Sequence, residues 1–193
     1  MRVVAGQFKG RRLSGPTKSA TRPTSDKVRE ALFSILGDIT DARVLDLFAG
    51  TGALGIEALS RGAAHATFVE RDRTAVAVIR ENLAATAAEQ AAEVSRVIAG
   101  DVARYLADAR ADDVQFDLVL IDPPYELAEQ FTAPLAKGLP ALLAPDAVVV
   151  AECDRRTPLM LESPQSATQN PLALATERRY GDTLLRIFRA SQL

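Results

Sequence analysis

The sequence predicts an α/β protein built on a mostly parallel β-sheet with helices on both faces. Short, almost wholly apolar segments alternate along the chain with segments of helical periodicity, which is typical of a parallel sheet covered on both sides. The last two extended segments follow each other without a helix, which favours an antiparallel C-terminal end. With 193 residues, 48% of them hydrophobic and 25% charged, the chain has the size and composition of one globular domain.

The N-terminus predicts a small arm followed by a helix. Residues 1–24 contain two short strands around Gly6 and Gly10 and form a hairpin arm, so that residues 25–193 are the main domain. Ser25 can cap a helix that ends at Gly37. Its expected buried face repeats at helical spacing and comprises Val28, Ala31, Leu32, Ile35 and Leu36.

The rest of the chain alternates strand and helix. Seven strands are expected, over residues 43–48, 67–70, 94–98, 116–121, 147–152, 173–179 and 183–188. Helices are expected over residues 53–61, 73–88 and 128–143, with a short one from Val102. The last two strands flank Tyr180-Gly181-Asp182, which indicates a hairpin.

The composition excludes several classes of protein. One cysteine, Cys153, rules out an internal disulfide framework, and one histidine, His65, makes a metal site or a His-based triad improbable, so no metal is expected. We interpret Cys153 as a buried structural thiol and His65 as part of a surface turn. No apolar run approaches a membrane span, and no signal-peptide pattern opens the chain, so a soluble cytoplasmic protein is expected.

Charge is unevenly distributed along the chain. Residues 1–30 carry eight basic and two acidic side chains, whereas the whole chain has a formal net charge of -2, so the remainder is acidic. A basic segment on an acidic body is typical of a polyanion-binding surface, because Lys and Arg release counterions when they neutralise phosphates. A merely solvated basic face is the alternative.

A glycine-rich loop lies between the first expected strand of the sheet and the next helix. It reads Asp46-Leu-Phe-Ala-Gly50-Thr-Gly52-Ala-Leu-Gly55, and Glu70 ends the following strand. Glycines there allow a sharp turn and a close approach of backbone to a ligand at a helix N-terminus. The pattern predicts a nucleotide-type ligand, with tight turn packing as the alternative.

Asp46 favours S-adenosylmethionine over NAD as that ligand. A carboxylate at this strand end can face a cationic amino acid moiety but would repel a pyrophosphate. Glu70 suits either ligand, because it can accept hydrogen bonds from ribose hydroxyls. Asp101 follows the third strand, where it could bind an adenine amino group or cap the next helix, and both roles can hold.

The end of the fourth strand carries the most informative stretch, Asp122-Pro123-Pro124-Tyr125. Prolines stiffen the backbone and supply carbonyl acceptors without N–H donors, and here they stand beside an aromatic ring. Such a turn suits a planar base with an exocyclic amine. Asp122 and the Pro123 carbonyl would accept the amine hydrogens while Tyr125 stacks on the base, and methyl transfer would then need mainly proximity and alignment.

These motifs resemble those of class I S-adenosylmethionine-dependent amino-methyltransferases, which share a Rossmann-like fold. Val3-Val-Ala-Gly-Gln-Phe-Lys-Gly-Arg-Arg-Leu and Thr21-Arg-Pro-Thr-Ser-Asp-Lys-Val-Arg-Glu-Ala-Leu-Phe extend the resemblance to bacterial 16S ribosomal RNA guanine-N2 methyltransferases, the ribosomal small subunit methyltransferase D family. The resemblance implies methylation of N2 of one guanine in 16S rRNA, within a 30S assembly particle. A monomer is expected, because no apolar heptad or surplus strand demands a partner.

The resemblance also implies roles for individual residues. The cofactor would contact Asp46, Phe48, Gly50, Thr51, Gly52, Glu70, Arg71, Asp101, Val102 and Asp122. The target base would meet Asp122, Pro123, Pro124 and Tyr125. The RNA would be bound by Lys9, Arg11, Arg12, Arg22, Thr24 and Tyr125.

Two other functions remain as alternatives. The same chemistry on DNA would methylate adenine N6 or cytosine N4, although a chain of this size shows no evident target-recognition domain. A non-catalytic RNA-binding assembly factor would have no need for Asp46, Glu70, Asp122 and Tyr125 together. An NAD oxidoreductase ranks last because of the charge of Asp46.

Overall fold

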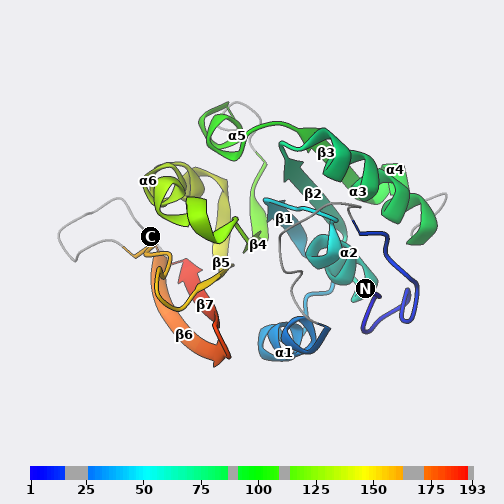
Figure 1. The fold of residues 1–193 in the computed structure, drawn as a ribbon, viewed down its shortest axis with the longest axis horizontal. Helices are drawn as coiled ribbons and strands as arrows, with labels where there is room; N and C mark the ends of the chain where they lie inside the picture. The colour runs from blue at the N-terminus through cyan, green and yellow to red at the C-terminus, as the bar shows by residue number, and fades with distance from the viewer. Residues whose placement is uncertain (16–25, 87–90, 109–113, 163–171, 191–193) are drawn as a thin grey trace. The chain divides into compact units, whose positions relative to one another are not determined.

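A computed structural model of the chain describes residues 1–15, 26–86, 91–108, 114–162 and 172–190 (Figure 1). The chain divides into two compact units, residues 1–100 and residues 101–193. The units supply three and four strands, so the seven strands expected from the sequence are present. The division into an arm over residues 1–24 and a domain over residues 25–193 remains a prediction.

The first unit contains three parallel strands in the order β3-β2-β1. They are β1 (Arg43–Leu47), β2 (His65–Glu70) and β3 (Ser95–Ala99), and its helices are α1 (Asp26–Leu36), α2 (Ala53–Ser60), α3 (Arg73–Thr86) and α4 (Ala91–Val94). Strands β1 and β2 are rich in buried apolar side chains, as expected of a sheet with helices packed on it, whereas the edge strand β3 has no buried residue. The carboxyl ends of β1 and β2 therefore lie side by side, because Leu47 pairs with Val69.

The N-terminal segment folds back as expected, but it forms one isolated bridge, between Arg2 and Arg12, in place of two strands. Its backbone is bound by α2: the N–H groups of Val4 and Ala5 donate to the Glu57 carboxylate at 2.7 and 3.0 Å. At Gly6 a Cβ atom would lie 1.7 Å from the carbonyl oxygen of Ser60. A side chain at position 6 would therefore separate this segment from α2.

Helix α1 buries a different face from the one that its periodicity predicts. Val28 and Leu32 are buried as expected, but Ile35 is 40% exposed, while Phe33 and Arg29 are fully covered. Arg29 is held inside because its guanidinium donates to Asp26 and to the Arg2 carbonyl and lies 3.7 Å from Glu57. The ion pairs of Arg29 thus place a charged side chain on the buried face of α1, while Ile35 of the expected apolar face is exposed.

The second unit contains β4 (Phe116–Ile121), β5 (Leu143–Asp154), β6 (Leu172–Tyr180) and β7 (Thr183–Ala190) in the order β4-β5-β7-β6. Strands β4 and β5 are parallel, whereas β7 is antiparallel to both β5 and β6. Figure 1 shows β6 and β7 as the orange and red pair, so the predicted C-terminal hairpin is confirmed. Helices α5 (Val102–Asp108) and α6 (Ala128–Gly138) contact each other in this unit.

The segment expected to be helical over residues 128–143 is shorter in the structure. Helix α6 ends at Gly138, a 3₁₀ turn covers Leu139–Leu142, and β5 begins at Leu143, four residues before the expected strand. Pro140 lacks a backbone N–H and cannot continue the helical ladder, which explains the change. The fold is otherwise the mostly parallel α/β sheet that the sequence predicts. Within the described residues, no helix is long and apolar enough to cross a membrane.

Candidate functional site

The loop after β1 adopts a conformation that few side chains tolerate. Phe48 has a φ angle of +61°, and Gly50 and Gly52 have φ angles of +55° and +77°. Glycine occupies such angles at no steric cost, but a phenylalanine there is strained, and strained residues cluster at ligand sites. The N–H of Gly52 closes the turn on the Ala49 carbonyl at 2.7 Å. The loop is therefore a closed turn with three residues at positive φ angles.

Gly55 lets α2 approach the sheet. A Cβ atom there would lie 2.4 Å from the ring of Phe68 and 3.1 Å from Asp46 Oδ2. This is the role of the third glycine in the dinucleotide fingerprint, close packing of helix on strand. Tight packing thus explains Gly55, and the ligand approach expected at Gly50 stays a prediction.

Asp46 is buried beneath this loop. Its side chain is 1% exposed, and Oδ2 accepts a hydrogen bond from the Gly55 N–H at 2.9 Å. Burial raises the pKa of Asp46 to about 8; the Gly55 hydrogen bond opposes this rise, and the nearby charge of Glu70 adds to it. The raised pKa means that Asp46 is more easily protonated than the ordinary carboxylate that the sequence predicts.

Glu70 ties the loop to the end of β2. Its Oε2 accepts from the Gly50 N–H at 2.9 Å and its Oε1 accepts from the Asp72 N–H at 2.8 Å. Each carboxylate oxygen has a second lone pair, so ribose hydroxyls could still donate to it. Arg71, the next residue, is exposed.

The loop after β3 is hydrogen-bonded to the end of β2, because the Gly100 N–H donates to the Glu70 carbonyl at 2.9 Å. Asp101 caps α5, since its Oδ1 accepts from the Arg104 N–H at 3.1 Å. The capping role expected for Asp101 is confirmed. Val102, the first residue of α5, is buried.

The turn after β4 is rigid. Pro123 is buried and Asp122 is partly exposed. The Pro124 carbonyl accepts from the Leu127 N–H at 2.8 Å and starts a 3₁₀ turn over Tyr125–Leu127. The side chain of Tyr125 lies outside the described part of the structure.

The predicted cofactor residues fall into two groups. One unit contains Asp46, Phe48, Gly50, Thr51, Gly52, Glu70 and Arg71, while the other contains Asp101, Val102 and Asp122. The sequence prediction that both groups meet at one ligand stays a prediction.

The basic arm residues differ in what they do. Lys9 and Arg12 are exposed. Arg11 instead donates from Nη1 to the carbonyls of Ala85 and Thr86 at 2.8 and 2.6 Å, at the C-terminus of α3. That contact suits the negative end of the helix dipole and gives Arg11 a structural role. Arg22 and Thr24 lie outside the described residues.

Asn82 is a residue that the sequence reasoning missed. It is 1% exposed, and its Nδ2 donates to the carbonyls of Thr51 and Ser14 at 2.9 and 3.1 Å, while its Oδ1 accepts from the Ser14 N–H at 2.7 Å. Asn82 thus joins the glycine loop to the N-terminal segment. An asparagine three residues after Ile79, on the apolar face of α3, was the available signal.

Two further expectations have clear outcomes. Cys153 is fully buried, as predicted, and burial raises the pKa of its thiol. His65 opens β2 and is half-buried, so its interpretation as part of a surface turn is wrong. Burial, followed by the charges of Arg43 and Arg96, lowers the pKa of His65.

Comparisons with known proteins agree on one family. Residues 1–189 match the family described as Conserved hypothetical protein 95. Over 192 residues the chain is 38% identical to YlbH of Bacillus subtilis, which has a provisional rRNA methyltransferase name; the alignment covers 98% of each chain. It is 43% identical to ribosomal RNA small subunit methyltransferase D of Escherichia coli, over 65% of this chain and 60% of that relative.

The fold comparison extends this likeness. The solved structure of Escherichia coli yhhF, provisionally named a methyltransferase, has a TM-score of 0.79 and 34% identity, covering 99% of this chain and 98% of that one. A provisionally named methylase of Haemophilus influenzae, HI0767, has a TM-score of 0.75 and 30% identity at the same coverage.

Proposed function

The chain belongs to the Conserved hypothetical protein 95 family of class I methyltransferases, and from this premise we propose that it methylates N2 of a guanine in 16S ribosomal RNA, with S-adenosylmethionine as methyl donor. The observation that carries the proposal is the family match over residues 1–189, because it includes both the glycine loop and the Asp-Pro-Pro-Tyr turn. The relatives named as rRNA methyltransferases support RNA as the substrate class.

The residues of the glycine loop fit this cofactor. The positive φ angles at Phe48, Gly50 and Gly52 open the backbone to a ligand. Asp46 lies beneath the loop as a buried acid, ready to ionise beside the cationic amino group of a methionine moiety. Glu70 would take the ribose hydroxyls, and Arg71, Asp101 and Val102 would border the adenine.

When bound, S-adenosylmethionine supplies a methyl group on a positively charged sulfur. In this proposal, Asp122 and the Pro123 carbonyl accept hydrogen bonds from the two amine hydrogens of the guanine, and Tyr125 stacks on its ring. These acceptors would favour a pyramidal amine nitrogen. With the methyl group transferred to this nitrogen and the sulfur left as a neutral thioether, Asp122 or water would take up the proton that the amine releases.

The substrate we propose is 16S rRNA within a 30S assembly particle, bound by a monomer in the cytoplasm. The test is transfer of a tritiated methyl group to unmodified 30S particles, naked 16S rRNA and duplex DNA in parallel, with nucleoside analysis of the product. N2-methylguanine from either ribosomal sample is the expected product. Methylated adenine or cytosine in DNA would support a DNA enzyme instead, and cofactor binding without transfer would support an assembly factor.

Asp122 provides the sharpest mutational test of the site. Asp122→Ala should reduce methyl transfer on the order of 100-fold or more, because it removes an acceptor for the reacting amine, while the dissociation constant for S-adenosylmethionine changes far less, since Asp122 is one of ten residues expected at the cofactor. Asp122→Asn retains an acceptor oxygen and should keep part of the activity. Transfer rates and calorimetric titrations of the cofactor measure the two effects.

Asp117→Ala is the matched control, since Asp117 is an exposed carboxylate on the same strand. Its transfer rate should match that of the unaltered protein. If Asp122→Ala weakens cofactor binding and leaves transfer at a saturating cofactor concentration intact, the proposed role of Asp122 is wrong.

A further inference from the structure

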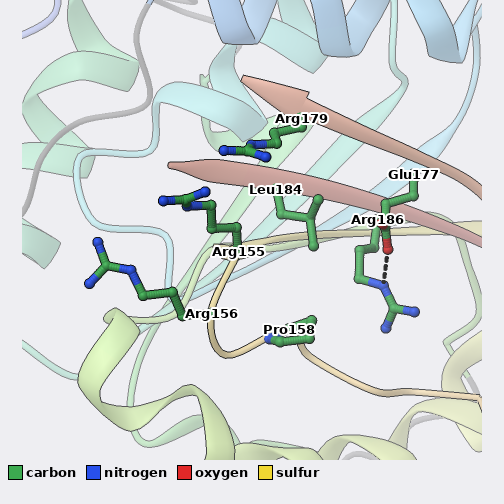
Figure 2. A pocket seen from close by; sticks show the side chains of 7 residues that line it. All are labelled: Arg155, Arg156, Pro158, Glu177, Arg179, Leu184 and Arg186. Carbon is green, nitrogen blue, oxygen red and sulfur yellow. Dashed lines mark hydrogen bonds and ion pairs between the residues drawn. The ribbon is translucent and has the colours of Figure 1, made fainter. Parts of the chain in front are cut away.

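A cavity of about 590 Å³ lies in the second unit, and none of the residues assigned so far lines it. Its wall is made by the segment after β5 and by the facing strands β6 and β7. Figure 2 shows the seven lining residues: Arg155, Arg156, Pro158, Glu177, Arg179, Leu184 and Arg186. Four of the seven are arginines, and we call this hollow the arginine cavity.

Arg186 forms part of the frame of the cavity. Its side chain is 5% exposed, and its guanidinium contacts Glu177 at 3.1 Å, Glu162 at 2.8 Å and the Leu159 carbonyl at 2.6 Å. Two carboxylates thus neutralise its charge. In Figure 2 its guanidinium points away from those of the other three arginines. A ligand would therefore meet the other three.

Arg155, Arg156 and Arg179 present their charged ends on one side of the cavity (Figure 2). Nε of Arg155 lies 3.2 Å from Asp182, and Nε of Arg156 lies 3.9 Å from Asp154. The Arg155 contact is made through Nε, and the Arg156 contact is too long for a hydrogen bond, so the paired Nη groups of both side chains remain as donors for a ligand.

Arg179 is held in the same way, because its Nε donates to the Gly181 carbonyl at 3.1 Å. Among the described residues no carboxylate lies within ion-pair distance of Arg179. Its positive charge is therefore not neutralised by the surrounding protein that the structure describes.

Strand β5 leads into the segment that lines the arginine cavity and also pairs with the strand that ends at Asp122. Strands β4 and β5 run parallel with Ile121 paired to Ala151, so Asp122 and Arg155 both lie beyond the carboxyl ends of this pairing. Arg155 stands three residues beyond the position opposite Asp122 in this register.

We propose that the arginine cavity binds the sugar-phosphate backbone of the RNA substrate next to the target base. Planar guanidinium forks match the oxygen geometry of phosphate, and three of them side by side suit a chain of phosphates better than a single anion. This inference rests on the proposed function, because it assigns the neighbouring Asp122 turn to the reacting base. It adds a second RNA contact, separate from the N-terminal arm.

The test compares two double variants of the full chain. Arg156→Ala/Arg179→Ala should weaken binding of a fluorescein-labelled 16S rRNA transcript on the order of tenfold near 0.15 M salt. The slope of log affinity against log salt should flatten by about 1.4, because two phosphate contacts are lost. The KM for RNA should rise to a similar extent, while kcat at saturating RNA and the affinity for S-adenosylmethionine stay the same.

Arg178→Ala/Arg189→Ala is the matched control, because it removes two exposed arginines of the same unit that do not line the cavity. Its RNA affinity should stay within about twofold of the unaltered protein. Equal losses in both variants would mean that only overall charge matters, and the proposal would be wrong. It would also be wrong if the cavity variant lost affinity for free guanosine monophosphate but bound RNA normally.

The two proposals fail separately. If the unaltered protein methylates no ribosomal RNA, the proposed function fails. If it methylates ribosomal RNA and Arg156→Ala/Arg179→Ala keeps its KM and salt slope, only the assignment of the arginine cavity fails.

Discussion

Burial raises the pKa of the Asp46 carboxyl group to about 8. This pKa predicts how the binding of a cationic ligand depends on pH. If a cationic amino group binds beside Asp46, it favours the ionised form, so binding releases a proton near neutral pH. The affinity for S-adenosylmethionine should therefore rise as the pH increases from 6.5 to 8.5. Calorimetric titrations at several pH values measure this dependence.

Asp46→Asn is the control, because an amide oxygen can still accept the Gly55 N–H but cannot ionise. This variant should lose more affinity at pH 8.5 than at pH 6.5. The ligand's own amino group also titrates near this range, but it does so equally in both proteins. Identical pH profiles for the two proteins would contradict the contact between Asp46 and the amino group.

The raised pKa of Asp46 also affects stability. The folded state keeps a proton on this group that the unfolded chain has already released, so the free energy of unfolding falls as pH rises from about 4 to 8. The Asn variant lacks this proton-linked contribution. Its unfolding free energy should depend less on pH across that window, as urea titrations would show.

At the scale of elements, Asn82 on α3 joins the glycine loop to the N-terminal segment through Thr51 and Ser14. Asn82→Ala should destabilise the protein by about 2 kcal/mol, because buried backbone groups of both segments lose partners. Hydrogen exchange should rise at residues 12–15 and at the loop together. Faster exchange at only one of the two segments would show that Asn82 does not link them.

Thr74→Ala is a suitable control for Asn82→Ala, because Thr74 is an exposed polar residue on the same helix. Its substitution should leave exchange at both segments unchanged. The affinity for S-adenosylmethionine should fall only in Asn82→Ala, since that variant alone loosens the loop.

At the scale of the whole molecule, fewer basic side chains of the N-terminus are open to an RNA ligand than the sequence indicates. Arg29 is buried against Asp26 and Glu57, and Arg11 is bound to carbonyls of α3, whereas Lys9 and Arg12 face solvent. Lys9→Ala/Arg12→Ala should therefore weaken RNA binding and flatten its salt dependence without loss of stability.

Arg11→Ala is expected to behave differently. It removes a cap from α3 and a contact with the Phe8 ring, so it should lower the melting temperature. Salt-dependent RNA binding and thermal unfolding of the two variants separate the roles. An unchanged salt slope in Lys9→Ala/Arg12→Ala would contradict RNA binding by the arm.

The sequence by itself determined the fold class, the seven strands, the glycine loop, the turn at Asp122 and the buried state of Cys153. These features depend on local pattern: apolar runs, helical spacing and glycine or proline at fixed positions leave few structural alternatives. The same local reasoning identified the capping role of Asp101. The predicted end of α6 was wrong, because Pro140 lacks the backbone N–H that a longer helix would need.

Only the tertiary structure decided which charged groups are buried and what they bind. Four features join residues far apart in the chain: the burial of Arg29, the raised pKa of Asp46, the link through Asn82, and the gathering of Arg155, Arg156 and Arg179. A side chain's pKa and partners depend on desolvation and on neighbours brought by other elements, which no local pattern specifies.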